Sequence, residues 1–349
     1  MDFYIIKILF LTTLAFIFTI FWTPLLTHLL YKYKMGKQIR NGGATPIFSR
    51  LHAHKEGTPT MGGLLVWATT LIFSLLFFYL AQFLPWPFFK KLNFLSRAET
   101  LLPLGALVAT ALVGLFDDWL DTKGKNGTGR GGLKVKHRLL IYTAIAVVGA
   151  WWFYFKLGWD IFHVPFAGNF QIGWSYILIF IFVIVAAAFS VNETDGLDGL
   201  AGGVLLACFG AYAVIAFSLG KYDLASFCGV IVGALLAFLW FNINPARFFM
   251  GDTGSMSLGI TLGIIAMLTN TALILPVIGF VFVIESASVI MQLLSKKLRG
   301  GKKIFLSSPI HHHFEAKGWS EPKIVMRFWI IAGVSAVLGL AVFLLDKTL

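Results

Sequence analysis

Long apolar runs follow one another from the start of the chain to its end, and short polar segments separate them. A helix needs about 20 apolar residues to cross the hydrocarbon core of a bilayer. Because the runs are continuous rather than alternating, they favour membrane helices over the strands of a barrel. Ten spans are predicted, at 4–31, 60–83, 100–116, 138–157, 174–190, 200–219, 223–241, 255–269, 271–294 and 326–345. We therefore expect an all-α polytopic membrane protein in which residues 1–349 form one domain.

The composition excludes a soluble domain. Hydrophobic residues make up 58% of the chain and charged residues 13%, whereas about a quarter of a soluble domain is charged. The net charge of +12 raises the question of a nucleic-acid partner, but no basic stripe is interleaved with aromatic residues in a soluble segment, and no nucleic acid is expected. Cys208 and Cys228 lie inside apolar runs and are interpreted as small buried hydrophobic residues.

The basic residues predict the orientation in the membrane. Ten spans place both termini on the same side, and 21 of the 28 Lys and Arg residues fall in or beside the odd-numbered loops. Cytoplasmic loops of membrane proteins carry an excess of Lys and Arg. The odd-numbered loops are therefore predicted to be cytoplasmic and both termini external.

Carboxylates gather on the same side, which orientation alone does not require. Asp117 and Asp118 end the third run, and Asp195 and Asp198 lie between the fifth and sixth; Asp252 precedes the eighth. An Asp that caps a helix N-terminus contributes about 1 kcal/mol, and this alternative stays open for Asp252. At the C-terminal end of a span the helix dipole repels an acid, so Asp117 and Asp118 need a compensating cation. These aspartates offer oxygen ligands, with no Cys among them and no His nearby in sequence. Such a set of ligands favours Mg²⁺ or Mn²⁺, and an ion of this kind in turn holds a substrate phosphate.

Three further features carry polar chemistry. Lys55 and Thr60 lie in a Gly- and Pro-punctuated loop that can take up a phosphate, although a lone cytoplasmic Lys is commonly an orientation signal. The consecutive residues 311–313 are all His; they cannot all ligate one ion from one helix, so contact with phosphates or a sugar is favoured over zinc. Glu285 is the only acid well inside a span, where an ionised carboxylate costs about 2.5–3.5 kcal/mol, and its role stays open.

Five segments together resemble the phospho-N-acetylmuramoyl-pentapeptide-transferase branch of the polyprenyl-phosphate hexose-1-phosphate transferase superfamily. They are KEGTPTMGG at 55–63, LFDDWLD at 115–121, NETDGLDGLAGG at 192–203, NPARFFMGDTGSMSLG at 244–259 and PIHHHFE at 309–315. The two aspartate motifs are typical of the superfamily, and TPTMGG and the triple His of the branch. The resemblance covers nearly the whole chain.

The resemblance implies a multi-pass enzyme of the bacterial inner membrane with a cytoplasmic active site, in many members a homodimer. The implied reaction moves phospho-N-acetylmuramoyl-pentapeptide from its UDP-linked precursor to undecaprenyl phosphate with Mg²⁺, giving lipid I and UMP for peptidoglycan synthesis. It makes Asp252 a metal ligand and Asp117 and Asp118 the acidic pair at the lipid phosphate. One of that pair would remove a proton from the nucleophile; a covalent aspartate is the alternative. The matching substrate-binding positions are Lys55, Thr60, Asn192, Asp195, Gly196, Leu197, Asp198, Asn242, Phe249, His311, His312 and His313.

The sequence departs from the family at three positions. Asp121 stands where the family usually has Lys, Phe189 where it has Asn, and Glu193 where it has an apolar residue. If a cation is needed near Asp121, then Lys123, Lys136 or Arg138 must supply it. Two other functions compete with the transferase described. A transferase for UDP-N-acetylglucosamine or a related sugar would lack the triple-His loop, and a cation- or proton-coupled transporter would carry more acids near the midplane.

Overall fold

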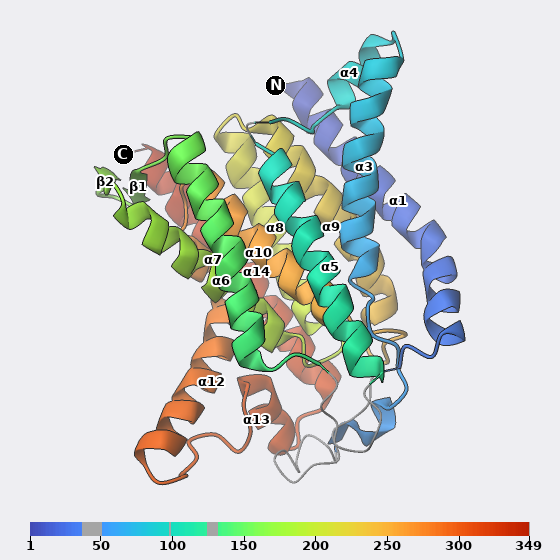
Figure 1. Cartoon of the computed structure of the whole chain (residues 1–349), viewed down its shortest axis with the longest axis vertical. Helices are drawn as coiled ribbons and strands as arrows, with labels where there is room; N and C mark the ends of the chain where they lie inside the picture. Colours follow the sequence, from blue (N-terminus) through green and yellow to red (C-terminus); the bar gives the residue numbers. More distant parts are fainter. Residues whose placement is uncertain (37–50, 98, 124–131, 349) are drawn as a thin grey trace.

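The structure is a computed structural model that describes residues 1–36, 51–97, 99–123 and 132–348 (Figure 1). Within these ranges, nine helices are long and apolar enough to cross a membrane. They are α1 (Asp2–Lys32), α3 (Leu64–Phe83), α5 (Leu101–Lys123), α6 (Val135–Trp151, continued by the π-helical η2, Trp152–Lys156), α7 (Ser175–Thr194), α8 (Leu200–Ser218), α9 (Tyr222–Asn242), α10 (Gly251–Leu268) and α14 (Glu321–Thr348). The predicted all-α polytopic fold is confirmed.

The remaining predicted span, 271–294, is divided at Gly279. A four-residue helix, α11 (Leu275–Ile278), precedes the break, and α12 (Phe280–Leu298) follows it. Pro276 lies in the first turn of α11, where a residue without an N–H is tolerated, whereas in the interior of one continuous helix it would remove a backbone hydrogen bond and introduce a kink. Because of the break, α12 leans away from the bundle, whereas α10 stays inside it (Figure 1).

Helix α10 lies at the centre of the bundle. Seventeen of its 18 residues are buried, and the exception is Asp252 in the first turn. Glycines allow the neighbouring backbones to come this close: a Cβ on Gly63 would lie 2.3 Å from the Cα of Gly254, and a Cβ on Gly114 would lie 2.4 Å from the carbonyl oxygen of Asp252. The one partly exposed residue of the central helix is therefore an acid at its end.

Short elements cover the two ends of the bundle. The chain termini, α4 (Pro87–Leu92) and the hairpin of β1 (Ile161–Val164) and β2 (Gly168–Gln171) lie together at one end, called here the terminal end (Figure 1). The two strands are antiparallel, with Ile161 opposite Gln171. The opposite end, called here the site end, carries α13 (Ile310–Ala316), and η1 (Ala53–Lys55) precedes α3 there. Termini at one end agree with an even number of crossings.

Two helix boundaries differ from the prediction and change the setting of the aspartates. The third predicted run ends at 116, but α5 continues to Lys123, so Asp117 and Asp118 lie inside a helix rather than at its end. The eighth run was predicted to begin at 255, but α10 begins at Gly251 and includes Asp252. Hydropathy marks where apolar side chains stop, whereas a helix continues as long as its backbone hydrogen bonds and caps are satisfied.

Candidate active site

Asp118 caps a helix that lies far from it in sequence. Its carboxylate accepts the backbone N–H groups of Asp252 and Thr253, each at 3.0 Å, and the hydroxyl of Thr60 at 3.1 Å. The first turn of a helix has N–H groups without intrahelical partners and a partial positive charge, so a carboxylate is stabilised there. The capping alternative for Asp252 is therefore wrong, because the cap of α10 comes from α5.

Gly251 makes this arrangement possible. Its φ of +74° lies in the left-handed region, and a Cβ there would come within 2.5 Å of both Asp118 Oδ2 and Thr60 Oγ1. The backbone N–H of Gly251 donates to Asp195 Oδ2 at 3.1 Å. Carboxylates from α5 and from the end of α7 thus hold the start of α10 between them.

Arg138, from α6, joins two carboxylates from different helices. Its Nε donates to Asp117 Oδ2 at 2.8 Å and its Nη2 to Asp252 Oδ2 at 2.6 Å. Asn192, from α7, accepts Arg138 Nη1 at 3.2 Å and donates to Asp252 Oδ1 at 2.7 Å. Among the three candidate cations that the sequence offered, Arg138 is the one in contact with these acids. One guanidinium between two carboxylates leaves one negative charge unbalanced, which suits a further cation.

Lys55 forms a second charged group beside the first. Its ammonium donates to Asp198 Oδ1 at 2.7 Å and to Glu321 Oε1 at 2.5 Å, and lies 5.8 Å from the centre of the Phe249 ring. Asn244 donates to Asp198 Oδ2 at 3.0 Å and to Glu321 Oε2 at 3.2 Å. The buried ammonium thus has charged partners on the 195–198 turn and on the first turn of α14.

Three of the predicted substrate-binding residues, Leu197, Asn242 and Phe249, lie in turns that backbone hydrogen bonds hold in place. Asn242 accepts the N–H of Gly199 at 2.9 Å and donates to the carbonyl of Phe248 at 2.7 Å. Leu197 is only 4% exposed, and the N–H of Phe249 donates to the carbonyl of Pro59 at 2.8 Å. These contacts fix the shape of the turns between α7 and α8 and between α9 and α10.

Two histidines share one carboxylate at the site end. Glu315 Oε2 lies 2.6 Å from His312 Nδ1 and 3.1 Å from His52 Nε2, and all three residues are buried. Burial and the neighbouring His311 lower the pKa of His312 to about 3. Burial raises the pKa of Glu315, but hydrogen bonds from His312 and His52 outweigh it and hold this pKa well below its usual range. The three potential ligand atoms lie within 4.8 Å of one another. The carboxylate oxygen lies at hydrogen-bond distance from both histidines, so we interpret the group as a hydrogen-bonded contact between His52 and α13.

The other two histidines of the triple-His motif have different surroundings. His311 Nδ1 lies 2.9 Å from Glu285 Oε2, and neither residue is exposed. His313 Nδ1 accepts the N–H of Leu306 at 3.1 Å. His311 and His312 therefore each contact a buried glutamate, whereas His313 makes a separate loop contact.

Sequence patterns missed several residues of the site. Four such residues are Glu321, Asn244, His52 and Glu315. Each contacts a predicted site residue, His52 through the rings of His52 and His312. An acid at the edge of an apolar run was the signal that identified Asp252, and the same signal applies to Glu321 before the last run. The pairing of Lys55 with Glu321 could not be predicted, because 266 positions separate them.

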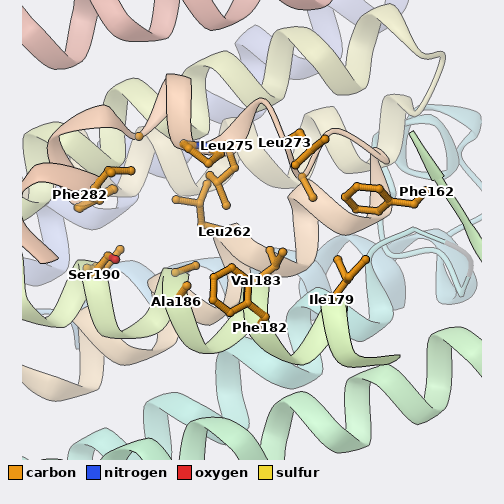
Figure 2. A pocket seen from close by; sticks show the side chains of 16 residues that line it. Phe162, Ile179, Phe182, Val183, Ala186, Ser190, Leu262, Leu273, Leu275 and Phe282 are labelled. Atoms are coloured by element: carbon orange, nitrogen blue, oxygen red, sulfur yellow. The ribbon is translucent and has the colours of Figure 1, made fainter. Parts of the chain in front are cut away.

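An apolar groove of about 320 Å³ runs along α7 on its side facing α10, α11 and α12. Figure 2 shows Ile179, Phe182 and Val183 of α7 opposite Leu262, Leu275 and Phe282. Ser190 lies at the same end as Phe282, and its hydroxyl accepts that of Ser286 at 2.6 Å (Figure 2). Since Ser190 is two residues before Asn192, the groove approaches the acids from inside the membrane region.

Residues 100–270 match the family described as glycosyl transferase family 4. A phospho-N-acetylmuramoyl-pentapeptide-transferase from Chloroflexus aggregans is 37% identical over 351 residues, covering 97% of this chain and 90% of that protein. The enzyme of the same name from a Geobacillus species is 39% identical, covering 94% and 95%, and that from Listeria monocytogenes is 38% identical with the same coverage.

Proposed function

Because this chain belongs to the phospho-N-acetylmuramoyl-pentapeptide-transferase family, we propose that it makes lipid I. In this reaction phospho-N-acetylmuramoyl-pentapeptide moves from its UDP-linked precursor to undecaprenyl phosphate, and UMP is released. The observation that carries the proposal is the convergence of Asp117, Asp118, Asp195 and Asp252, from three separate segments, around the start of α10. Phosphoryl transfer depends mainly on positioning and charge stabilisation, which such a cluster supplies.

The two adjacent aspartates are proposed to have different roles. Asp118 is fully engaged by the N-terminus of α10 and Thr60, so it holds Asp252 in place. Asp117 faces Arg138 and Asp252 and is the better candidate for the proton acceptor. A phosphate oxygen of undecaprenyl phosphate would form a bond to the β-phosphorus of the precursor, and the bond from that phosphorus to the UMP oxygen would break. A proton on the attacking phosphate would pass to Asp117.

The oxygen donors at this site fit Mg²⁺. One cationic group, the Arg138 guanidinium, donates hydrogen bonds to carboxylate oxygens of Asp117 and Asp252 and to the amide oxygen of Asn192. These are hard donors of the kind that magnesium takes, and Asp252 is the proposed ligand. Bound Mg²⁺ would offset charge on the diphosphate. Asp252 would hold the ion, Asn192 would position the Asp252 carboxylate, and Arg138 would offset the charge of one of the two acids.

Substrates would approach this site from two sides. The nucleotide is proposed to bind at Lys55, Phe249, Asn242 and the 195–198 turn. The diphosphate and sugar are proposed to contact His311 and His312, and His313 would lie at the margin of the site. The polyprenyl tail is proposed to occupy the groove in Figure 2, since it is apolar and reaches Ser190 beside Asn192. The excess of Lys and Arg in the odd-numbered loops supports a cytoplasmic site in the bacterial inner membrane. A homodimer remains a prediction from the family.

Transfer of labelled UDP-N-acetylmuramoyl-pentapeptide to undecaprenyl phosphate in detergent tests the proposal. We expect a butanol-soluble labelled product and UMP in the presence of Mg²⁺, and neither in the presence of a chelator. UDP-N-acetylglucosamine serves as the matched donor. Product from this donor alone would assign the chain to the related sugar-phosphate transferases instead.

A further inference from the structure

Glu285 is the one deep acid in the chain whose role the sequence left open. It lies in the second turn of α12, is not exposed, and its Oε2 is 2.9 Å from His311 Nδ1. His311 is the first His of α13, which lies beside α12 at the site end (Figure 1). The break at Gly279 lets α12 start in its own direction, so a residue of the ninth apolar run meets the loop that follows it.

The pair leaves two polar atoms without hydrogen-bond partners among the described residues. They are Glu285 Oε1 and His311 Nε2, both buried. The Nε2 atom faces the 195–198 turn, because a Cβ on Gly196 would lie 2.3 Å from it. Buried polar atoms are rarely left unpaired in proteins, so an unpaired nitrogen beside a substrate-binding turn indicates a partner supplied by the ligand.

The charges around His311 favour its protonated form. Glu285 of α12, Glu315 of α13 and Glu193 of α7 face the imidazole, and His312 adjoins it. Burial lowers the pKa of His311, but the Glu285 carboxylate, followed by Glu315 and Glu193, outweighs it and raises this pKa above its usual value. With Nδ1–H donated to Glu285, the protonated ring presents a second, charged N–H at Nε2.

We propose that Glu285 is a positioning residue for the transfer reaction, acting through His311. By accepting the Nδ1–H, it fixes the ring and its charge so that Nε2–H is directed at a phosphate oxygen held beside the 195–198 turn. Charged donors form short, strong hydrogen bonds to phosphate. This inference rests on the proposed function, because the phosphate is that of the nucleotide substrate. It also assigns a purpose to Gly196, since a larger residue would displace the imidazole.

The pH dependence of turnover in Glu285→Gln tests the proposal. Glutamine keeps an oxygen that accepts the Nδ1–H but removes the negative charge. We expect the alkaline limb of kcat/KM against pH to move down by about one unit, so that kcat/KM at pH values above the wild-type limb falls about tenfold and recovers on acidification. Glu193→Gln, which removes a facing charge without a described hydrogen bond to the ring, is expected to shift the limb less.

A matched control lies at the terminal end, where Asp346 pairs with His163. Asp346→Asn removes a carboxylate from the same kind of pair far from the acids, and its pH profile is expected to match the wild type. A wild-type profile for Glu285→Gln would overturn the proposal. So would an equal loss of activity at every pH, since a purely structural role predicts that result. If Glu285→Gln does not fold, Glu285→Asp is used; its shorter side chain moves the charge away from the ring, so a smaller downward shift of the alkaline limb supports the proposal and an unshifted limb overturns it.

Thermal unfolding distinguishes this inference from the proposed function. His311 has a raised pKa when folded, so its pair with Glu285 contributes stability that is fully present below the unfolded value of 6.5 and is lost as the pH rises through the folded value. The melting temperature of the wild type should therefore fall across that window, and less steeply in Glu285→Gln. Absence of turnover in the wild type would reject the proposed function, whereas identical melting profiles would reject the Glu285–His311 pairing.

Discussion

Carboxylates pair with cations or imidazoles at both ends of the bundle, but they do so in different ways. At the terminal end the pairs are isolated: Lys7 meets Asp223 at 3.0 Å, and His163 meets Asp346. At the site end each cation serves several segments, since Arg138 contacts acids of α5 and α10. An isolated pair is balanced and only ties two elements together. The shared cations leave an excess of negative charge at this end, which suits the additional cation of the proposed function.

The largest expected effect comes from removing the acid at the end of α10. Asp252→Asn should lower turnover by about 10³-fold or more, because an amide is a poor magnesium ligand and the charge at the reacting phosphate changes. The protein should stay folded, since Asp118 rather than Asp252 caps α10. Lipid I formation and a melting curve check both statements. Near-normal turnover would remove Asp252 from the proposed metal site.

Arg138 is the cation that two acids share at the site end, so its removal tests the contrast with the isolated pairs of the terminal end. Arg138→Gln leaves Asp117 and Asp252 without their described counter-charge, and we expect about 100-fold lower turnover. The melting temperature should fall in the absence of divalent ions, and Mg²⁺ should restore more of it than in the wild type. Melting curves with Mg²⁺ and with chelator measure this difference. An unchanged response to Mg²⁺ would show that the ion does not approach these acids.

Glu321 links α14 to Lys55, on the proposed nucleotide side of the site. Glu321→Gln weakens its contact with Lys55 and the N–H of Asp198, and we expect KM for the nucleotide substrate to rise about tenfold, with a smaller change in kcat. Asp346→Asn is the control at the terminal end and should leave KM unchanged. Equal effects of the two variants on KM would mean that Glu321 acts only through stability.

The smallest effect is expected at Asp121. No described hydrogen bond or ion pair involves its side chain, and Arg138 already supplies the cation that its family counterpart would add. Asp121→Lys should therefore change turnover by no more than about twofold. This is much less than the tenfold change that corresponds to one pKa unit of interaction free energy. A loss of Mg²⁺-dependent turnover would show that Asp121 belongs to the site.

The membrane helices could be predicted because the length and apolar composition of each run are local properties of the sequence, and they suffice to identify a segment that crosses the lipid. The aspartates could be singled out because an acid at the edge of such a run is unusual. Their partners could not: the cap that Asp118 provides spans 134 positions, and the contact between Lys55 and Glu321 spans 266. Local pattern contains no information on such pairings, which depend on how the helices pack. The division of the ninth run at Gly279 was missed for a related reason. The side chains stay apolar through the turn at Gly279, so hydropathy shows no break where the helix is interrupted.

The distance between Lys55 and Glu321 along the chain has a consequence for synthesis. Lys55 leaves the ribosome before Glu321, which begins α14. The contacts of Lys55 therefore cannot be completed until α14 has been inserted. A chain truncated before α14 would keep Asp117, Asp118 and Asp252 but lack one of the two carboxylates that hold this ammonium. Under the proposed function, a chain that stops before α14 would therefore bind its nucleotide substrate weakly, even if its earlier helices inserted correctly.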